Sequence, residues 1–377
     1  MRYYIIAGEA SGDLHGSNLI KALQKNDNQA VIRAWGGDMM AAAGADVRKH
    51  YRDLAFMGFL EVVKNLRTIL GNMAFCKRDI LEFKPDVVIF IDYPGFNLRI
   101  AKWLHDYQRA KILKIKRFYY ISPQIWAWHT SRVHLINRIM DKVFCILPFE
   151  KDFYQKYNYE VDYIGHPLLD VVKNAQDTEG GRLEDILDKN KPVVAILAGS
   201  RRQEIEAMLP KMLEIVPFFP DYQFVIAAAS AQNLSYYDKF ISNMAGNSSI
   251  KIVQNQTYDV LKIASAALVK SGTSTLETAL FGVPQVVCYK GSALSFAIAK
   301  RVVKIKYISL VNLIADKEIV KELIQDDFTV ENLRIELTKA IENQEIMKKN
   351  YAILRGLLGN EGASDRAGAL MVKYLEK

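Results

Sequence analysis

The segment Leu268–Pro284 combines residue types that suit the binding of a phosphorylated ligand. An apolar run ends in Ser271-Gly272-Thr273-Ser274, and a helical pattern follows. A small, hydroxyl-rich turn at a helix start presents free backbone N–H groups and the positive end of the helix dipole, which together favour a phosphate. Glu277, four residues after Thr273, lies on the same helix face and within reach of a diol such as ribose. The alternative is an ordinary strand–turn–helix with a capping serine or threonine.

A second helix start with the same character is Ala198-Gly199-Ser200-Arg201-Arg202, which follows an apolar run. Gly199 lets the chain turn close to a ligand, Ser200 can cap the helix, and Arg201 can hold a diphosphate with two hydrogen bonds. The phosphate-binding pattern G-x-x-x-x-G-K-[ST] is absent. No Asp-x-Asp pair ends a strand, so we expect the positive charge to come from Arg201 and the helix dipoles, without a metal ion. Further along, Ser309–Leu313, with Asn312 inside it, adds polar contacts or forms a short edge strand.

Titratable residues gather in two loops of the first half. Gly8–Gly16 follows the first apolar run and contains Glu9, Asp13 and His15 among small residues that let a ligand approach the backbone. It lacks the G-x-G-x-x-G spacing, which disfavours a nicotinamide cofactor. Asp92 ends the apolar run Val87–Ile91, where a carboxylate can take a proton from a substrate hydroxyl. Its alternative role is a turn or helix-capping aspartate ahead of a proline.

A third loop, Ser122–His129, holds two tryptophans and a histidine beside a proline. These side chains either line a substrate slot or pack under the loop, and the sequence favours neither reading.

Short apolar runs that alternate with helical patterns predict two mainly parallel sheets covered by helices. The loops above follow these runs, and ligands of such sheets gather at the carboxyl ends of the strands. The predicted strands of the first half are Tyr3–Ala7, Val31–Trp35, Val87–Ile91, Phe118–Ile121, Val143–Leu147 and Val161–Ile164. Those of the second half are Val193–Leu197, Phe224–Ala228, Ile250–Val253, Ala267–Val269 and Gln285–Cys288.

The chain changes character near Gly165-His166-Pro167-Leu168, where a polar stretch follows the first series of strands. We therefore expect one domain over residues 1–168 and a second over 169–345. From about Val330 the pattern is helical. Residues 346–377 are expected to form helices that return to the first domain or are exchanged with a partner subunit in a homodimer.

The charge excess is concentrated in the first half. Of the net charge of +8 over 377 residues, Met1–Leu168 carries +7, from 24 Lys and Arg against 17 Asp and Glu. A basic face suits an acidic partner, although lysine-rich surfaces also serve solubility. Leu54–Val63 is too short to cross a bilayer but apolar enough to dip into one, with basic residues beside it; alternatively it is a core helix.

Other bulk properties narrow the classes of protein further. The three cysteines lie far apart without metal-binding spacing, which favours a reducing compartment. The first apolar run is too short for a signal peptide, and no window approaches the ~20 apolar residues of a membrane-spanning helix. We expect a cytoplasmic protein, or one held at a membrane face.

Taken together, the motifs resemble those of lipid-A-disaccharide synthases, in the same order and over nearly the whole chain. They are Gly8-Glu9-Ala10-Ser11-Gly12-Asp13, Ile91-Asp92-Tyr93-Pro94-Gly95-Phe96-Asn97, Ser122-Pro123-Gln124-Ile125-Trp126-Ala127-Trp128, Leu147-Pro148-Phe149-Glu150, Gly165-His166-Pro167, Gly199-Ser200-Arg201, Ser271-Gly272-Thr273-Ser274-Thr275-Leu276-Glu277 and Val311-Asn312-Leu313. The set is far more specific than any one member.

The resemblance implies an α/β protein of the GT-B class, with two Rossmann-like domains facing each other across a cleft and C-terminal helices that pack back on the N-terminal domain. It implies an inverting transfer that joins UDP-2,3-diacylglucosamine to 2,3-diacylglucosamine 1-phosphate (lipid X). The product is a β-1,6-linked disaccharide 1-phosphate, with release of UDP. No cofactor or metal is implied. The expected location is the inner face of the inner membrane, on an anionic surface, as part of outer-membrane biogenesis.

The resemblance also implies roles for individual residues. Asp92 matches the essential aspartate and is the candidate base, with Glu9, Asp13 and His15 as rivals or sugar contacts. UDP would lie on Gly199, Ser200, Arg201, Gly272, Thr273, Ser274, Glu277 and Asn312, with Arg201 and the Thr273–Ser274 turn on the diphosphate.

Three alternatives remain open on the sequence alone. A UDP-N-acetylglucosamine 2-epimerase shares the fold and the UDP site but needs no lipid-facing surface. A nucleotide-sugar-binding regulator would perform no reaction, against which Asp92 and the acidic first loop argue mildly. A nucleic-acid binder fits the basic charge, but no recognition motif supports it, and we expect no nucleic-acid partner.

Overall fold

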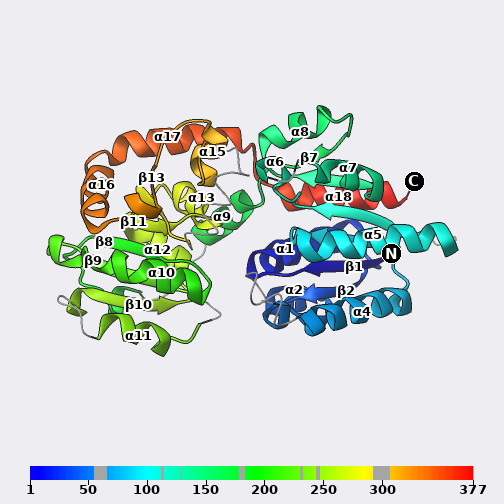
Figure 1. Cartoon of the computed structure of the whole chain (residues 1–377), viewed down its shortest axis with the longest axis horizontal. Coiled ribbons are helices and arrows are strands. Elements are labelled where there is room, and N and C mark those ends of the chain that lie inside the picture. Colours follow the sequence, from blue (N-terminus) through cyan, green and yellow to red (C-terminus); the bar gives the residue numbers. More distant parts are fainter. Residues whose placement is uncertain are drawn as a thin grey trace. The chain divides into compact units, whose positions relative to one another are not determined.

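The computed structural model describes residues 1–54, 66–111, 114–128, 130–177, 183–229, 232–242, 247–291 and 306–376 (Figure 1). The chain forms two compact units. Unit 1 comprises Met1–Asp170 and Asn360–Lys377, and unit 2 comprises Val171–Gly359. The first division falls two residues after the expected position 168. The second falls at 359, beyond the expected 345.

Unit 1 contains a seven-stranded parallel sheet with the order β3-β2-β1-β4-β5-β6-β7. The central strands are continuous apolar runs because helices cover both faces of the sheet. Alternate residues of β1 enter two different cores: Tyr4 and Ile6 lie in one, Tyr3 and Ile5 in the other. The strands are β1 (Arg2–Ala7), β2 (Val31–Gly36), β3 (Asp46–His50), β4 (Val87–Ile91), β5 (Lys116–Tyr120), β6 (Lys142–Cys145) and β7 (Asp162–Tyr163).

The helices of unit 1 flank this sheet on both faces (Figure 1). They are α1 (Ala10–Asn26), α2 (Asp38–Ala42), α4 (Leu66–Phe83), α5 (Pro94–Lys111), α6 (Ile125–Trp128), α7 (Arg132–Ile139), α8 (Pro148–Gln155) and α18 (Ala363–Leu375), with the short 3-10 helix η1 (Tyr51–Leu54). The helix α9 (Leu168–Asp177) begins in unit 1 and ends in unit 2.

The C-terminal helix α18 completes the core of unit 1. Its Ala367, Met371 and Val372 join Tyr3 and Ile5 in one cluster, and Figure 1 shows it in red beside the first elements of the chain. The expectation for residues 346–377 is only half right, because α17 (Gln344–Leu357) belongs to unit 2. There it buries one apolar face and packs against α13, α15 and α16.

Unit 2 contains a six-stranded parallel sheet with the order β10-β9-β8-β11-β12-β13. Its strands are β8 (Val193–Leu197), β9 (Gln223–Ala228), β10 (Ile250–Gln254), β11 (Ala264–Lys270), β12 (Gln285–Tyr289) and β13 (Lys321–Ile324). Its remaining helices are α10 (Arg202–Leu213), α11 (Ser235–Ile241), α12 (Thr257–Ile263), α13 (Thr273–Leu280), α15 (Leu310–Ala315) and α16 (Val330–Glu342), with 3-10 turns at Leu183–Asp185, Val216–Phe218, Asn247–Ser249 and Gln325–Asp327.

The structure differs from the sequence-based prediction in three places. The edge strands β3 and β13 were not predicted, because Asp-Val-Arg-Lys-His and Lys-Glu-Leu-Ile lack an apolar run. Residues 309–313 do not form the edge strand that was one of the two alternatives: Ser309 caps the helix α15 by accepting the backbone N–H of Asn312. Most of the predicted membrane-contacting segment Leu54–Val63 lies outside the described residues. Within the described residues, no helix has the length and apolarity to span a bilayer.

Candidate functional site

The carboxyl end of β4 holds Asp92 in an unusual backbone conformation. Asp92 and Tyr93 have φ values of 39° and 48°, in the left-handed region that non-glycine residues seldom occupy. Two buried groups hold the carbonyl of Asp92: the Asn97 side-chain amide donates to it at 2.8 Å, and the Tyr119 hydroxyl donates at 2.6 Å. Buried side chains therefore fix the backbone of Asp92, while the residue itself is exposed to solvent. Strain maintained in this way is common at functional sites.

The Asp92 carboxyl combines access for a substrate with a raised pKa. The dense protein around it, and then the nearby Glu9 carboxylate, raise the pKa of Asp92 to about 7, against an opposing hydrogen bond from the Tyr93 backbone. The residue is nevertheless solvent-exposed. A carboxylate that is reachable and has a pKa near neutrality suits the role of general base.

The first loop lies beside Asp92. Gly8 has no room for a side chain, because a β-carbon there would come within 2.5 Å of the Tyr93 ring. Glu9 is the N-cap residue of α1, is half-buried, and is the main charged neighbour of Asp92. The structure thus brings Glu9 and Asp92 together, as expected for sequence loops at neighbouring strand ends.

Asp13 has a structural position that argues against a role as base. Its side chain is 3% exposed. Its carboxylate accepts hydrogen bonds from the backbone N–H groups of Gly37 (2.7 Å), Met39 (3.1 Å) and Met40 (3.1 Å) at the start of α2. With both oxygens engaged at a helix N-terminus, the charge stabilises α2 and does not face a substrate.

His15 is buried together with His166 from the Gly165-His166-Pro167 motif. Burial lowers the pKa of His15 to about 4; burial, and then the neighbouring His15, lower the pKa of His166 to about 3. Nδ1 of His166 accepts the Leu168 N–H at 3.2 Å, and Nδ1 of His15 has no partner within the described residues. Both rings are therefore neutral at pH 7, and a ring with a pKa of about 4 is a weak base, so His15 is a poor candidate for the group that accepts the proton.

Glu150 is a titratable residue of this region whose role the sequence did not reveal. It is fully buried, and burial is the main cause that raises its pKa to about 7, with Asp92 contributing in the same direction. Oε2 accepts the backbone N–H groups of Ile146 and Leu147 at 3.0 and 2.9 Å, so Glu150 caps α8. A glutamate three positions after the N-cap residue, as Glu150 is after Leu147, is a known capping signal and could have identified it.

The tryptophan loop packs partly beneath the surface. The Trp126 ring contacts Phe149 edge-on at 4.8 Å, and the Ser122 hydroxyl hydrogen-bonds the buried Tyr154 hydroxyl at 2.7 Å. These contacts favour the packing role for Trp126. His129 lies outside the described residues.

In unit 2 the loop before α10 is built around a carboxylate. Gly199 has φ 110°, and a β-carbon there would come within 2.6 Å of Glu204 Oε2. Glu204 accepts the backbone N–H groups of Ser200 (3.2 Å) and Arg201 (3.3 Å), and the Arg201 guanidinium at 3.2 Å. The expected capping by Ser200 is not observed: Arg201 is the N-cap residue, and Glu204 satisfies the backbone donors.

The predicted turn before α13 is present. Gly272 is the N-cap residue, and the exposed Thr273 and then Ser274 begin the helix, where a backbone N–H has no carbonyl four residues earlier in the helix. The next N–H, that of Thr275, donates to the Gly272 carbonyl at 3.1 Å. Glu277 is half-buried and accepts the Tyr258 hydroxyl at 2.8 Å. Burial raises the pKa of Glu277, while hydrogen bonds from Tyr258 and Ser274 oppose this shift.

Lys270, the last residue of β11, is a second cation that the sequence prediction overlooked. Its Nζ lies 2.9 Å from Glu204 Oε1. A β-carbon on Gly272 would lie 3.5 Å from the same Nζ. The lysine therefore stands beside both predicted anion-facing turns. Its position as a charged residue at the end of an otherwise apolar strand could have identified Lys270 from the sequence.

Asn312 serves the fold and is not directed to a ligand. It is fully buried and its amide is fully used. Nδ2 donates to the Val320 carbonyl and to Glu322 Oε1, both at 2.9 Å, and Oδ1 accepts the N–H groups of Ile319 (2.8 Å) and Val320 (3.0 Å). These four bonds fix the segment that leads into β13, so the assignment of Asn312 to UDP is not supported.

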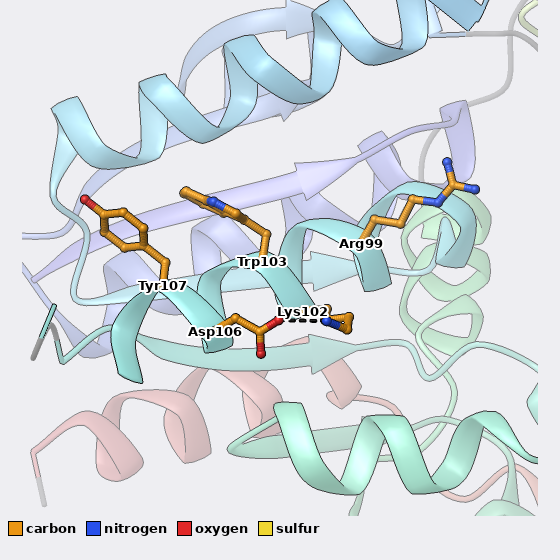
Figure 2. A pocket seen from close by; sticks show the side chains of 5 residues that line it. All are labelled: Arg99, Lys102, Trp103, Asp106 and Tyr107. Carbon is orange, nitrogen blue, oxygen red and sulfur yellow. Dashed lines mark hydrogen bonds and ion pairs between the residues drawn. The ribbon is translucent and has the colours of Figure 1, made fainter. Parts of the chain in front are cut away.

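An open pocket of about 360 Å³ lies along the side of α5 in unit 1 and is not the site described above. Figure 2 shows its lining side chains, with Lys102 paired to Asp106 at 2.7 Å. The Lys77 ammonium lies over the Trp103 ring at 5.4 Å. The lining is basic and aromatic: Arg99, Lys102, Trp103, Asp106 and Tyr107.

Metal-binding groups do not gather in the part of the chain that the structure describes. There, no set of three or more His, Cys, Asp or Glu side chains lies close enough to hold a metal ion.

Comparison with known proteins identifies the family. Residues 3–368 match the family model for lipid-A-disaccharide synthetase. The chain is 36% identical to the lipid-A-disaccharide synthase of Geobacter metallireducens, covering 100% of this chain and 98% of the relative.

Solved structures with 14% identity share the fold. The UDP-GlcNAc 2-epimerase of Neisseria meningitidis, bound to UDP-GlcNAc, gives a TM-score of 0.63 with 100% of both chains covered. The calicheamicin glycosyltransferase gives 0.58, covering 99% of this chain and 97% of that one. The architecture is thus the GT-B plan of two parallel-sheet α/β domains, and sequence decides between the activities that share it. The chain belongs to the lipid-A-disaccharide synthetase family and is a glycosyltransferase of lipid A biosynthesis.

Proposed function

We propose that the protein transfers the diacylglucosaminyl group of UDP-2,3-diacylglucosamine to the 6-hydroxyl of 2,3-diacylglucosamine 1-phosphate, with inversion at the anomeric carbon. The hydroxyl oxygen forms the new bond to the anomeric carbon as the bond to UDP breaks. The hydroxyl proton passes to a base, and UDP departs with the bonding electron pair. The family membership supports the reaction class, and the Asp92 site is the observation that carries the mechanism.

In this proposal unit 1 supplies the base. Asp92 is exposed, its carbonyl is held by Asn97 and Tyr119, and its raised pKa keeps the conjugate acid stable enough to retain a proton. Glu9 contributes to the electrostatic field at Asp92 and is a candidate contact for a sugar hydroxyl. Asp13 and His15 support the loop, as their burial and bonding indicate.

Unit 2, in the same proposal, binds the UDP part of the donor. Arg201 and the first turn of α13 supply positive charge toward the diphosphate, and Glu277 faces the ribose. Charge that develops on the departing UDP is stabilised best by donors already in place. The reaction then proceeds without a cofactor or metal, so activity persists in EDTA.

The anionic membrane surface is the remaining partner that we propose. Trp103 and Tyr107 line a basic pocket with Arg99 and Lys102 on α5 (Figure 2). Aromatic rings beside basic side chains are typical of membrane interfaces. The double variant Trp103→Ser/Tyr107→Ser should lose much of its sedimentation with anionic phospholipid vesicles, while transfer in detergent micelles persists. Equal sedimentation of variant and wild type would remove α5 from the membrane surface.

Incubation with both acylated precursors tests the proposed reaction directly. With EDTA present, mass spectrometry should find the disaccharide 1-phosphate and UDP in equal amounts. In the proton NMR spectrum of the product, the coupling constant of the new anomeric proton should show a β linkage. Asp92→Asn is the control for the base. Isomerisation of UDP-N-acetylglucosamine with no disaccharide formed would replace this proposal with the epimerase reaction.

A further inference from the structure

The ion pair between Lys270 and Glu204 joins the two turns to which the donor's diphosphate is assigned. Glu204 belongs to the start of α10, and Lys270 ends β11 immediately before the turn of α13. The side chains of Lys270 and Glu204 are only 20% and 17% exposed, and that of Arg201 is 44% exposed. The pair is therefore partly shielded from solvent, where charge interactions are stronger than at an open surface.

Glu204 occupies a position that suits an anion. Its two oxygens receive two backbone N–H groups, the Arg201 guanidinium and the Lys270 ammonium, at 2.9–3.3 Å. Burial alone would raise the pKa of Glu204, but attraction by Lys270, followed by Arg201, outweighs burial and lowers it. The carboxylate thus stays ionised and orients both cations.

The charges at the two turns also show why Arg201 alone would supply little net positive charge to a diphosphate. With Glu204 ionised, Arg201 and Lys270 together leave a single net positive charge at the two turns. If Lys270 were absent, Glu204 would offset the charge of Arg201, and less positive charge would remain at these two turns to oppose that of a diphosphate. Lys270 restores the attraction that Arg201 alone would lose.

Space around the lysine supports access to the second turn. The missing β-carbon of Gly272 leaves the Lys270 ammonium beside the first residues of α13, at 3.5 Å from where that carbon would be. A phosphate on the N–H groups of this turn would come within reach of the ammonium without a change in the backbone.

We propose that Lys270 binds the diphosphate of the UDP-sugar together with Arg201, and that Glu204 holds both cations in position. This inference rests on the proposed function, since it assigns one more residue to the donor site. Lys270 supplies charge to the phosphates of the bound donor and to those of the departing UDP.

Calorimetric titration of UDP and of uridine into the full-length protein tests this role. Lys270→Met, which keeps the length of the side chain but removes the charge, should weaken UDP binding about ten-fold or more. Uridine binding should be unchanged, because uridine has no phosphate. Lys270→Arg should stay within about three-fold of the wild type for UDP. Lys321→Met is the matched control, since Lys321 also pairs with a glutamate, Glu318, on an exposed part of unit 2.

Glu204→Gln separates binding from a structural ion pair. If Lys270 acted only through the pair, Glu204→Gln and Lys270→Met would weaken UDP binding equally. We expect Glu204→Gln to weaken UDP binding less than Lys270→Met does, because the poorer positioning of the two cations is offset by the removal of a competing negative charge. Equal losses in the two variants would overturn the proposal.

Further outcomes distinguish this proposal from the proposed function. Equal UDP affinity of wild type and Lys270→Met overturns the role of Lys270 and leaves the transfer reaction intact. A wild type that binds UDP through Lys270 but forms no disaccharide supports Lys270 and refutes the reaction. A wild type that binds no UDP refutes both.

Discussion

The pH dependence of transfer follows from the surroundings of Asp92. A base acts only when deprotonated, so activity is present above its pKa and is lost as the pH falls through it. With a pKa of about 7, roughly one tenth of Asp92 is ionised at pH 6 and roughly nine tenths at pH 8. We therefore expect kcat/KM to fall about ten-fold per pH unit below pH 7. At the ordinary pKa of 3.8, the profile would be flat over this range.

Glu9→Gln is the perturbation that identifies the group. It removes the carboxylate that raises the pKa of Asp92 after the effect of the surrounding protein. We expect the acidic limb to move down by about half a unit to one unit. Relative to its own rate at pH 8.5, the variant should then be about three- to five-fold more active at pH 6 than the wild type. Normalising each variant to its own rate cancels any loss of sugar contacts.

The assay is initial-rate release of UDP from both precursors in mixed micelles, from pH 5 to pH 9. The acceptor phosphate titrates near pH 6, but a protein substitution does not shift that titration. Glu82→Gln, an exposed glutamate on α4, is the charge-matched control. Asp92→Asn should lower turnover by about 10²–10⁴-fold and abolish the acidic limb. An acidic limb that stays in place in Glu9→Gln would refute the assignment of that limb to Asp92.

Two further predictions concern stability. Because His15 and His166 have folded-state pKa values of about 4 and about 3, the unfolded chain binds more protons below pH 6.5. The free energy of unfolding should therefore fall by roughly 2 kcal/mol per histidine between pH 7 and pH 5. In denaturant titrations His166→Asn, which keeps an acceptor for the Leu168 N–H, should lose about half of this pH dependence; an unchanged dependence would contradict the assignment. Gly368→Ala places a β-carbon 2.8–3.0 Å from the side chain and backbone of Ala22 and should destabilise unit 1 by about 1–3 kcal/mol. Gly356→Ala on α17, where a β-carbon would have nothing within 4 Å, should instead increase the free energy of unfolding. Equal changes in the two variants would contradict the close packing of α18 against α1.

The sequence predicted strands well where burial on both faces enforces apolar runs. All eleven predicted strands are present within a few residues of their expected bounds. The edge strands β3 and β13 were missed because a strand with one neighbour needs no continuous apolar run. Their positions depend on pairing with β2 and β12, which a local pattern does not contain.

The prediction of the site was less complete, because residue type does not reveal where a side chain points. Asp13 and Asn312 carry suitable groups, yet both accept hydrogen bonds from backbone N–H groups that lie outside their own motifs. Lys270 and Glu204 could not be assigned to the site from the sequence, because they meet only when β8 pairs with β11 and brings the two turns together. The position of Asp92 was predictable because it directly follows a buried strand, at the edge where parallel sheets place their ligands; its role as the base stays a prediction.

The order of synthesis gives the C-terminal helix a further consequence. Since α18 contributes Ala367, Met371 and Val372 to the core that holds Tyr3 and Ile5, the first unit to leave the ribosome is the last to be completed. All residues of unit 2 have been synthesised by Gly359. Unit 2 can therefore fold while the apolar side of α1 is not yet buried by α18. A premature stop directly after Gly359 would therefore damage unit 1, whose strands all precede those of unit 2.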